Sequence, residues 1–180
     1  MSPSKRNNLY ANSGIVVEIN VHQDIPKYDH FGALKGLEYQ KNLEKLAFTA
    51  GGRTQTAPAQ RLTDFVDGTL SNTLNDCSYQ PGLKSAPLHS LLPKIIGGRL
   101  RTGFKEFGKK MKGYYTEEAN VIGVESRTSS PVSIPRKENL EHTEIEGLYP
   151  CGEGGGYAGG IVSAAMDGER CAEAAIKGDW

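Results

Sequence analysis

The chain has 180 residues, of which 37% are hydrophobic and 23% charged, enough apolar material for an ordinary core in one or two small globular units. Its 21 basic residues balance its 21 acidic residues, so no net field attracts a polyanion and nucleic acid is excluded as a default partner. No apolar run approaches the roughly 20 residues of a membrane span and no secretory signal begins the chain, so we expect a cytoplasmic protein without a membrane partner.

The first third of the chain predicts one strand and two helices. The β-branched run from Ser13 to Asn20 predicts a largely buried strand. Residues 33–50 predict a helix that the glycine pair at 51–52 stops. Four residues recur on one face of that helix: Tyr39, Leu43, Leu46 and Ala50. A second, short helix is predicted after Pro58 and ends at Gly68.

The middle of the chain predicts a connector followed by one long helix. Residues 69–87 are rich in Ser, Asn, Pro and Gly and predict an ordered loop. Residues 91–111 predict a helix behind Ser90 as its N-cap. One apolar stripe steps by three and four along it: Leu92, Ile96, Leu100, Phe104, Phe107 and Met111. Lysines gather near its C-terminal end, where they favour the helix dipole, and indicate a solvated helix end.

The last third predicts strands and one helix. Residues 119–136 predict a strand, a turn and a second short strand, and residues 147–153 predict a strand that runs into glycines. The final helix is predicted over residues 160–177. Small and apolar residues form the face that we expect to pack against a sheet: Ile161, Ala164, Ala165, Gly168, Ala172 and Ile176.

Six glycines stand within the nine positions from Gly152 to Gly160, between the predicted strand and helix. Glycine permits positive φ and the close approach of a ligand, and the first N–H groups of a helix lack partners. Such a turn suits a phosphate or a polarised carbonyl. Residues 154–159 also fit the G-x-G-x-x-G fingerprint, but no second strand precedes Asp179, so we expect no independent binding of an ADP moiety. A turn that only permits tight packing is the alternative.

Three cysteines, Cys77, Cys151 and Cys171, are far apart and form no C-x-x-C pair. Their odd number and spacing argue against a disulfide framework and a zinc site, and we expect no metal. Cys151 precedes the glycines and could face a redox cofactor. We expect no resolving cysteine near Cys151, so a packed free thiol is the favoured interpretation. We assign no catalytic acid or base.

The segment GLYPCGEGGGYAGGIVSAAMDGERCAEAAI resembles the C-terminal segment of the FAD-dependent dehydrogenases known as NAD(FAD)-utilising dehydrogenases, within the two-dinucleotide-binding-domain flavoproteins. The resemblance extends over nearly the whole chain. Four further segments follow the order expected for that family: residues 11–19, 56–68, 77–82 and 107–136.

The resemblance implies an α/β fold with mixed α+β character, the C-terminal part of an FAD-binding flavoprotein that lacks the amino-terminal Rossmann βαβ unit. It implies a substrate- or cap-like region over residues 1–140. Residues 141–180 are then a strand, glycine loop and helix that return to the FAD-binding domain.

Site residues are carried over from the family by motif position. The resemblance implies that Glu153 binds the ribityl chain of FAD. It also implies that the flavin carbonyl is bound by the backbone N–H groups of Gly159, Gly160 and Ile161. Reduction places negative charge near that carbonyl, which a helix N-terminus stabilises. Gly152 and Gly154 complete the cofactor-binding loop.

A second segment also resembles one that lies near the isoalloxazine ring in the family. It supplies four candidate flavin or substrate contacts: Arg127, Thr128, Ser129 and Ser130. A hydrogen-bonded turn between two strands is the alternative for these residues.

These observations predict part of an FAD-dependent oxidoreductase, with NAD(P)H as the candidate electron donor. A missing amino-terminal half would hold most of the FAD, as in a truncation, a split gene or a cloned fragment, and we expect the isolated chain to be inactive. Self-association or an amino-terminal partner chain would cover the exposed sheet edge and helix face. The alternatives are a stand-alone anion- or nucleotide-binding module and a non-catalytic remnant.

Overall fold

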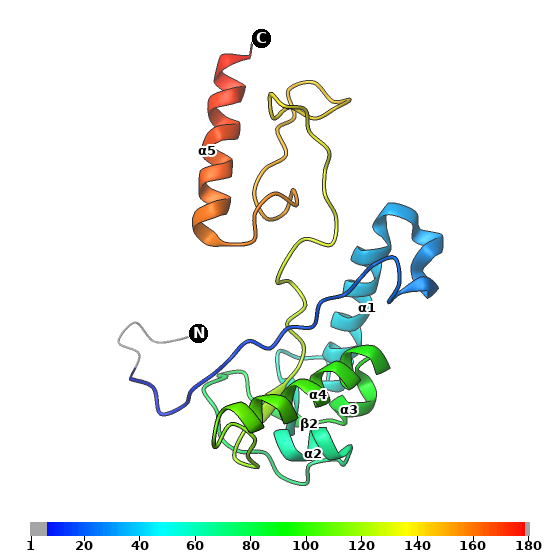
Figure 1. Cartoon of the computed structure of the whole chain (residues 1–180), viewed down its shortest axis with the longest axis vertical. Helices are drawn as coiled ribbons and strands as arrows, with labels where there is room; N and C mark the ends of the chain where they lie inside the picture. The colour runs from blue at the N-terminus through cyan, green and yellow to red at the C-terminus, as the bar shows by residue number, and fades with distance from the viewer. Residues whose placement is uncertain (1–6, 179–180) are drawn as a thin grey trace. The chain divides into compact units, whose positions relative to one another are not determined.

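The computed structural model describes residues 7–178, which fall into two compact units (Figure 1). One unit contains the chain up to Asn20 and Asn42–Glu125, and the other contains Val21–Lys41 and the chain from Ser126 onward. Helices and one small mixed sheet make up the regular structure, so the predicted fold class with α+β character is confirmed.

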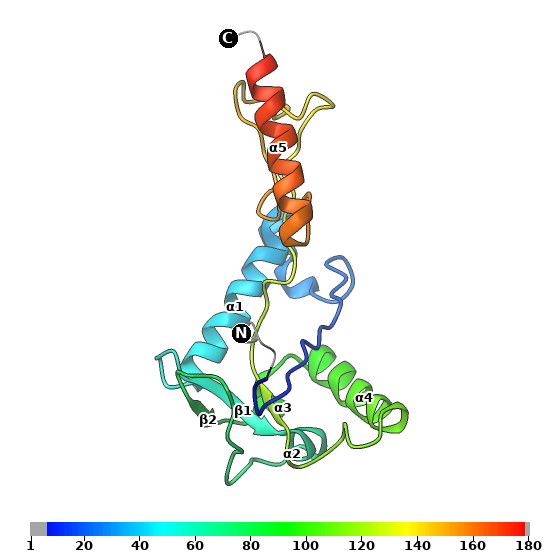
Figure 2. The same cartoon turned by 90° about the vertical axis from the view of Figure 1, so that its left-hand side faces the viewer.

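The sheet of the first unit has three short strands in the order β2-β1-β3. Figure 2 labels β1 and β2. They are β1 (Ala57–Arg61), β2 (Leu83–Ser85) and β3 (Asn120–Ile122). The central strand β1 pairs in parallel with β2 and antiparallel with β3. β2 lies inside the segment predicted as a loop, which is otherwise irregular.

The helix predicted between Pro58 and Gly68 is wrong in its first half. Residues 57–61 form β1, and only α2 (Leu62–Asp67) is helical, ending at Gly68 in the left-handed conformation with φ 76°. No β-branched residue occurs in β1, so pairing on both sides overrides its local preference. Pro58 is tolerated because the register with β3 begins one residue later, and its missing N–H breaks no bond of that ladder.

The helix predicted over residues 33–50 is confirmed as α1 (Lys35–Ala50). Tyr39, Leu43 and Ala47 are buried, so its buried face steps by four residues. Leu46, which was predicted on that face, is 39% exposed.

The long helix predicted behind Ser90 is two helices, α3 (Leu88–Leu91) and α4 (Lys94–Lys110). Pro93 separates them because a proline disfavours helical dihedrals in the preceding residue, and Leu92 is extended with φ −69° and ψ 142°. Ser90 is therefore no cap of the long helix. It lies inside α3, where its hydroxyl donates to the carbonyl of Pro87 at 3.0 Å.

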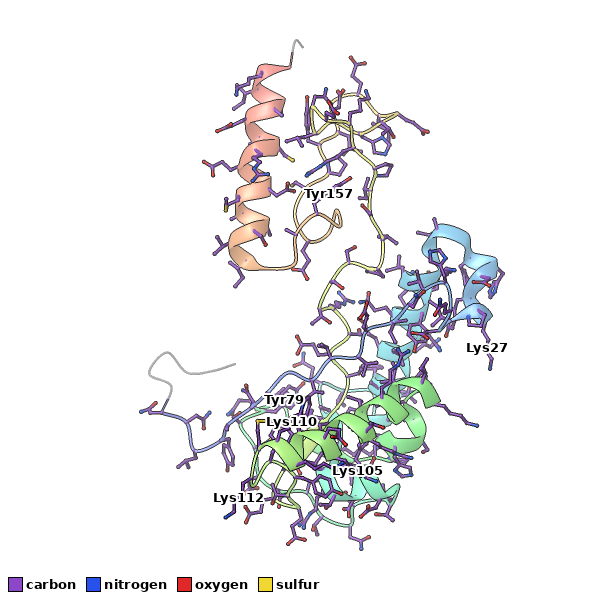
Figure 3. The ribbon with its side chains drawn as sticks, in the orientation of Figure 1. Lys27, Tyr79, Lys105, Lys110, Lys112 and Tyr157 are labelled. Carbon is purple, nitrogen blue, oxygen red and sulfur yellow. The ribbon has the colours of Figure 1, made fainter. Side chains whose placement is uncertain are left out.

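Helices α2, α3 and α4 supply most of the core of the first unit. Phe65 of α2 is fully buried and meets Phe104 of α4 edge to face, with ring centroids 5.9 Å apart. Leu88 of α3 is also fully buried, and its side chain would lie 3.0 Å from a Cβ at Gly123. The lysines near the C-terminal end of α4 are exposed, as expected for a solvated helix end (Figure 3).

The buried strand predicted from Ser13 to Asn20 does not form. The segment pairs with no strand among the described residues, and Val16 is 65% exposed. Its backbone contacts side chains instead: Arg99 donates to the carbonyl oxygen of Glu18 at 2.7 Å. Alternate residues of the run are half-covered, as in an extended segment, but a strand also needs a neighbouring sheet edge.

The second unit contains the 3₁₀ helix η1 (Pro26–Leu34), the start of α1, and α5 (Ile161–Lys177), joined by irregular segments. Within residues 7–178, the second strand predicted before Arg136 does not form, and neither does the strand predicted over residues 147–153. In their place the second unit has an isolated antiparallel bridge between Arg136 and His142. The side chains of Arg136 and Cys171 donate to the carbonyl of Pro150, which would accept a hydrogen bond from a neighbouring strand if residues 147–153 formed a strand.

The final helix is confirmed as α5, but the buried face differs from the predicted one. Asp167 and Cys171 are its buried residues. Several residues of the predicted face, with two neighbours, are exposed instead: Ile161, Val162, Ala165, Met166, Ala172 and Ile176. An ion pair at Asp167, described below, turns the helix so that this carboxylate faces inward. Within residues 7–178, no helix combines the length and apolar character that a bilayer crossing requires.

Candidate functional site

The glycine-rich stretch forms a compact turn that leads into α5. The N–H groups of Gly155 and Gly156 donate to the carbonyls of Cys151 and Glu153, at 3.3 and 3.0 Å. Tyr157 then donates its N–H to the carbonyl of Gly152 at 3.0 Å. The turn needs the left-handed backbone at Gly152, with φ 65°, and at Gly156, with φ 83°.

The glycines of this turn divide into packed and open positions. A Cβ at Gly156 would lie 2.8 Å from the carbonyl oxygen of Val132, and one at Gly155 would lie 3.0 Å from the backbone of Cys151. A Cβ at Gly154 or Gly159 would meet no atom within 4 Å among the described residues. Tight internal packing therefore explains why residues 155 and 156 are glycines. It does not explain the glycines at positions 154 and 159, whose backbones are open.

The predicted segment around Ser130 lies against this turn. The hydroxyl of Ser130 is 3.5 Å from the carbonyl oxygen of Gly154, and Ile134 donates its N–H to the carbonyl of Gly155 at 3.1 Å. The hydroxyl of Tyr157 donates back to the carbonyl of Ile134 at 2.6 Å. The glycine turn and the segment around Ser130 are thus in direct contact.

A buried ion pair fixes the turn to α5. The guanidinium of Arg136 donates to both carboxylate oxygens of Asp167, at 2.8 and 3.0 Å, and the side chains are only 12% and 9% exposed. Arg136 also donates to the carbonyl of Pro150 at 2.9 Å, while Asp167 accepts the N–H of Gly152 at 2.9 Å. Two side chains therefore hold both ends of the segment that enters the glycine turn.

Tyr157 closes the other face of Arg136. The guanidinium carbon lies 3.6 Å from the centroid of the Tyr157 ring, within the range of a cation–π contact. The Tyr157 hydroxyl donates a hydrogen bond to the carbonyl of Ile134, and its backbone N–H donates to the carbonyl of Gly152, so the ring is held at both ends of the residue.

The electrostatics of this cluster follow from its contacts. The hydrogen bond from Arg136, followed by that from the Gly152 N–H, holds the pKa of the Asp167 carboxyl below its ordinary value of 3.8. Hydrogen bonding to Asp167 raises the pKa of Arg136. The pair is therefore fully charged at neutral pH, and each charge satisfies the other.

The start of α5 carries no polar cap. Gly160 is its N-cap with an extended backbone, and within residues 7–178 no side chain bonds to the first N–H groups. The predicted contact residue Ile161 is 92% exposed at this end. The helix end thus presents backbone donors and a partial positive charge next to the open Gly159.

Glu153 lies within the turn with an exposed side chain. Its carboxylate has no hydrogen bond or ion pair with any residue that the structure describes. Arg127, Thr128 and Ser129 are exposed as well, whereas Ser130 is half-buried and donates to the carbonyl of Val132 at 2.6 Å. Of the four residues of that segment, the structure thus brings Ser130 to the turn by direct contact.

The ion pair that supports the turn is not predicted by any motif in the sequence. Its two members are 31 residues apart, and neither belongs to a motif. One signal was present: Asp167 is an acidic residue amid the small apolar residues of the final helix, where a charge needs a partner if it is buried.

The second unit also has an open hollow of about 630 Å³. It is lined by η1, the start of α1 and their neighbours: Val21, His22, Asp29, Gly32, Ala33, Lys35, Gly36 and Pro131. None of the predicted site residues lines it.

Comparison with protein families finds a match over residues 1–128 to a family described as "FAD-dependent protein, C-terminal domain-like". The matched region ends at Thr128, before the glycine turn. It contains the whole three-stranded sheet and helices α1 to α4.

A curated relative, an uncharacterized protein of Clostridium beijerinckii, is 40% identical to this chain over 169 residues. The match covers 93% of this chain and 31% of the relative, so the chain spans about a third of the relative's length.

Proposed function

Because this chain belongs to the FAD-dependent protein, C-terminal domain-like family, we propose that its glycine turn and the start of α5 contact the ribityl chain and isoalloxazine ring of FAD. Other residues, in a longer protein or in a partner chain, hold the remainder of the cofactor. The activity is that of an oxidoreductase of the dehydrogenase type, with NAD(P)H as electron donor.

Two features support this proposal: the open glycines of the turn and the uncapped helix start that follows the second of them. The backbones of Gly154 and Gly159 have free space where a Cβ would lie, so a planar ring system can approach them closely. The next donors along the chain belong to Gly160 and Ile161, at the positive end of α5. The residues present therefore fit a flavin edge that carries carbonyl oxygens.

Each neighbouring group has a definite task in this arrangement. The exposed carboxylate of Glu153 accepts hydrogen bonds from ribityl hydroxyls, since within the described residues its side chain has no competing partner. Thr128 and Ser129, which are exposed, offer hydroxyls to the flavin or its substrate from the adjoining segment, and Arg127 adds a positive charge there. Ser130, whose hydroxyl donates to the carbonyl of Val132, holds that segment against the turn.

FAD, when bound, supplies the electron-transfer chemistry. The chain's own residues position the ring and stabilise the negative charge that reduction places on its carbonyl region, through the helix N-terminus. The Arg136–Asp167 pair takes no part in that chemistry; it holds the turn in the shape that exposes these donors.

The test uses the ¹⁵N-labelled chain and two small ligands that separate the halves of FAD. We expect FMN, which carries the ribityl chain and ring, to shift the amide signals of Gly154, Gly159 and Gly160. ADP is expected to leave those signals in place. Equal shifts with ADP would favour the nucleotide-binding alternative, and no shift with FMN at millimolar concentration would contradict the proposal.

Glu153 provides the quantitative arm of this experiment. Glu153→Gln removes a charge-assisted hydrogen bond worth about 1.5 to 3 kcal/mol, so the Kd for FMN should rise about 10-fold or more. Glu169→Gln, which removes the same charge from an exposed position of α5, is the control and should leave the Kd unchanged. Equal effects of the two variants would remove Glu153 from the ribityl role.

A further inference from the structure

Two cysteines meet at the entrance of the glycine turn. Cys171 lies on the buried face of α5, only 3% exposed, and its thiol is 3.8 Å from the carbonyl oxygen of Pro150. Cys151 is the next residue after that proline and is exposed, so the contact of the Cys171 thiol with Pro150 places the two cysteines close together. The expectation that no resolving cysteine lies near Cys151 is therefore wrong.

The fold brings the two thiols together through the Arg136 ion pair. Arg136 holds the Pro150 carbonyl and Asp167 at once, which places the following turn of α5, with Cys171, beside residue 151. The same guanidinium lies 3.4 Å from the sulfur of Cys171. A cation at that distance stabilises developing negative charge on the sulfur during thiol chemistry.

We propose that Cys151 and Cys171 are a redox modification site, in which a peroxide converts the two thiols to an intrachain disulfide. This proposal does not depend on flavin binding, because every group that it uses belongs to the second unit of this chain.

The exposed and buried thiols have different roles in this reaction. Cys151 is open to solvent and therefore meets the peroxide first. Burial raises the pKa of the Cys171 thiol, although the charge of Arg136 opposes that rise. Cys171 therefore stays a protected thiol until its neighbour is oxidised, and then acts as the resolving group.

Atoms and electrons balance over two steps. The Cys151 thiolate attacks one oxygen of hydrogen peroxide, an S–O bond forms as the O–O bond breaks, and the released hydroxide takes a proton to leave as water. The sulfur of Cys171 then attacks the sulfur of the sulfenic acid. An S–S bond forms, the S–O bond breaks, and a second water leaves with the thiol proton. Two thiols lose two electrons in total, and one peroxide gains them.

Cys77 supplies an internal reference for this chemistry. It belongs to the first unit, is partly exposed, and has its sulfur 3.4 Å from the backbone nitrogen of Tyr79. Within the described residues, its sulfur makes no hydrogen bond to a second cysteine. The three thiols of the chain should therefore fall to one free thiol when one peroxide per chain has reacted.

The disulfide would also change the turn. It ties the residue before Gly152 to the middle of α5, alongside the existing contact of Gly155 with the Cys151 backbone. We therefore expect slower amide exchange over residues 152–157 in the oxidised chain than in the reduced chain.

The experiment treats the reduced chain with equimolar hydrogen peroxide, followed by thiol titration under denaturing conditions and peptide mapping without reductant. We expect free thiols to fall from three to one, a cross-linked peptide that joins residues 151 and 171, and full reversal by dithiothreitol. Cys77→Ser should retain the cross-link. Cys151→Ser, at an exposed site that should not affect folding, should abolish it.

Three results would overturn the proposal. One is retention of all three thiols after treatment with excess peroxide. A second is oxidation of Cys151 to the sulfinic acid without any cross-link to Cys171. The third is a cross-link that involves Cys77 as often as Cys171, because that pattern would indicate random pairing in an opened chain.

Discussion

Replacing Asp167 by asparagine tests whether the buried ion pair holds the glycine turn. The carboxylate accepts two hydrogen bonds from Arg136 and one from the N–H of Gly152, and its side chain is 9% exposed. Asparagine has nearly the same shape but one acceptor oxygen and no charge. The variant therefore leaves a guanidinium that is 12% exposed without a counter-ion.

The expected magnitude follows from the burial of the pair. Removing one partner of a buried ion pair costs about 3 to 5 kcal/mol, because the remaining charge stays desolvated. The amide oxygen of the new side chain can still accept the Gly152 N–H, and Arg136 keeps its bond to Pro150, so we expect about 3 kcal/mol, the lower end of that range. At about 1.4 kcal/mol per factor of ten, opening of the turn becomes about 100-fold more frequent.

Hydrogen exchange followed by mass spectrometry measures that opening locally. Peptides over residues 148–160 and 161–177 should exchange about 100-fold faster in Asp167→Asn than in the wild type. A peptide over β1, which belongs to the other unit, is the internal reference. Glu169→Gln removes one negative charge from an exposed position of α5 and is the matched control. Exchange in Asp167→Asn that stays within about threefold of this control would refute the role given to the ion pair.

Three other changes test separate parts of the structure. Because the folded pKa of Asp167 is lowered, its contribution to stability is complete above the unfolded value of about 4 and is lost as the pH falls toward the lower folded value. The difference in urea midpoint between the wild type and Asp167→Asn should therefore shrink as the pH falls below about 4, and a constant difference would contradict this. Gly156→Ala should lower the thermal midpoint, because the added Cβ would lie 2.8 Å from the Val132 carbonyl oxygen and the backbone there has φ 83°. Gly154→Ala should leave the thermal midpoint unchanged, because a Cβ at that position has free space, but it should weaken FMN binding. Within the described residues, the Tyr39 hydroxyl is buried without a hydrogen bond, and burial raises its pKa to about 12. Tyr39→Phe should therefore keep or raise the urea midpoint. A clear loss of stability would show that the hydroxyl does have a partner.

Much of the helical structure was predictable because its signals are local. The apolar period of α1 and the glycine start of α5 are written in neighbouring residues, and both helices begin within two residues of the predicted positions. The left-handed Gly68 likewise ended α2 as predicted. Pro93 was a local signal too, but the apolar stripe that continues across it concealed the break between α3 and α4.

The strands were predicted less well, because a strand requires a partner elsewhere in the chain. The β-branched run from Ser13 to Asn20 has high local preference but pairs with no strand in the part of the chain that the structure describes. Residues 57–61 have low preference and form the centre of the sheet, since β2 and β3 supply ladders on both sides.

The candidate site divides in the same way. The sequence by itself determined the glycine turn and the helix that follows it, because positive φ and helix initiation depend on a few adjacent residues. Only the tertiary structure decided which face of α5 is buried, that Arg136 meets Asp167, and that Cys171 contacts the residue before Cys151. The physical reason is that a buried charge takes its partner wherever the folded chain supplies one, and the cost of leaving it unpaired then fixes the orientation of the whole helix.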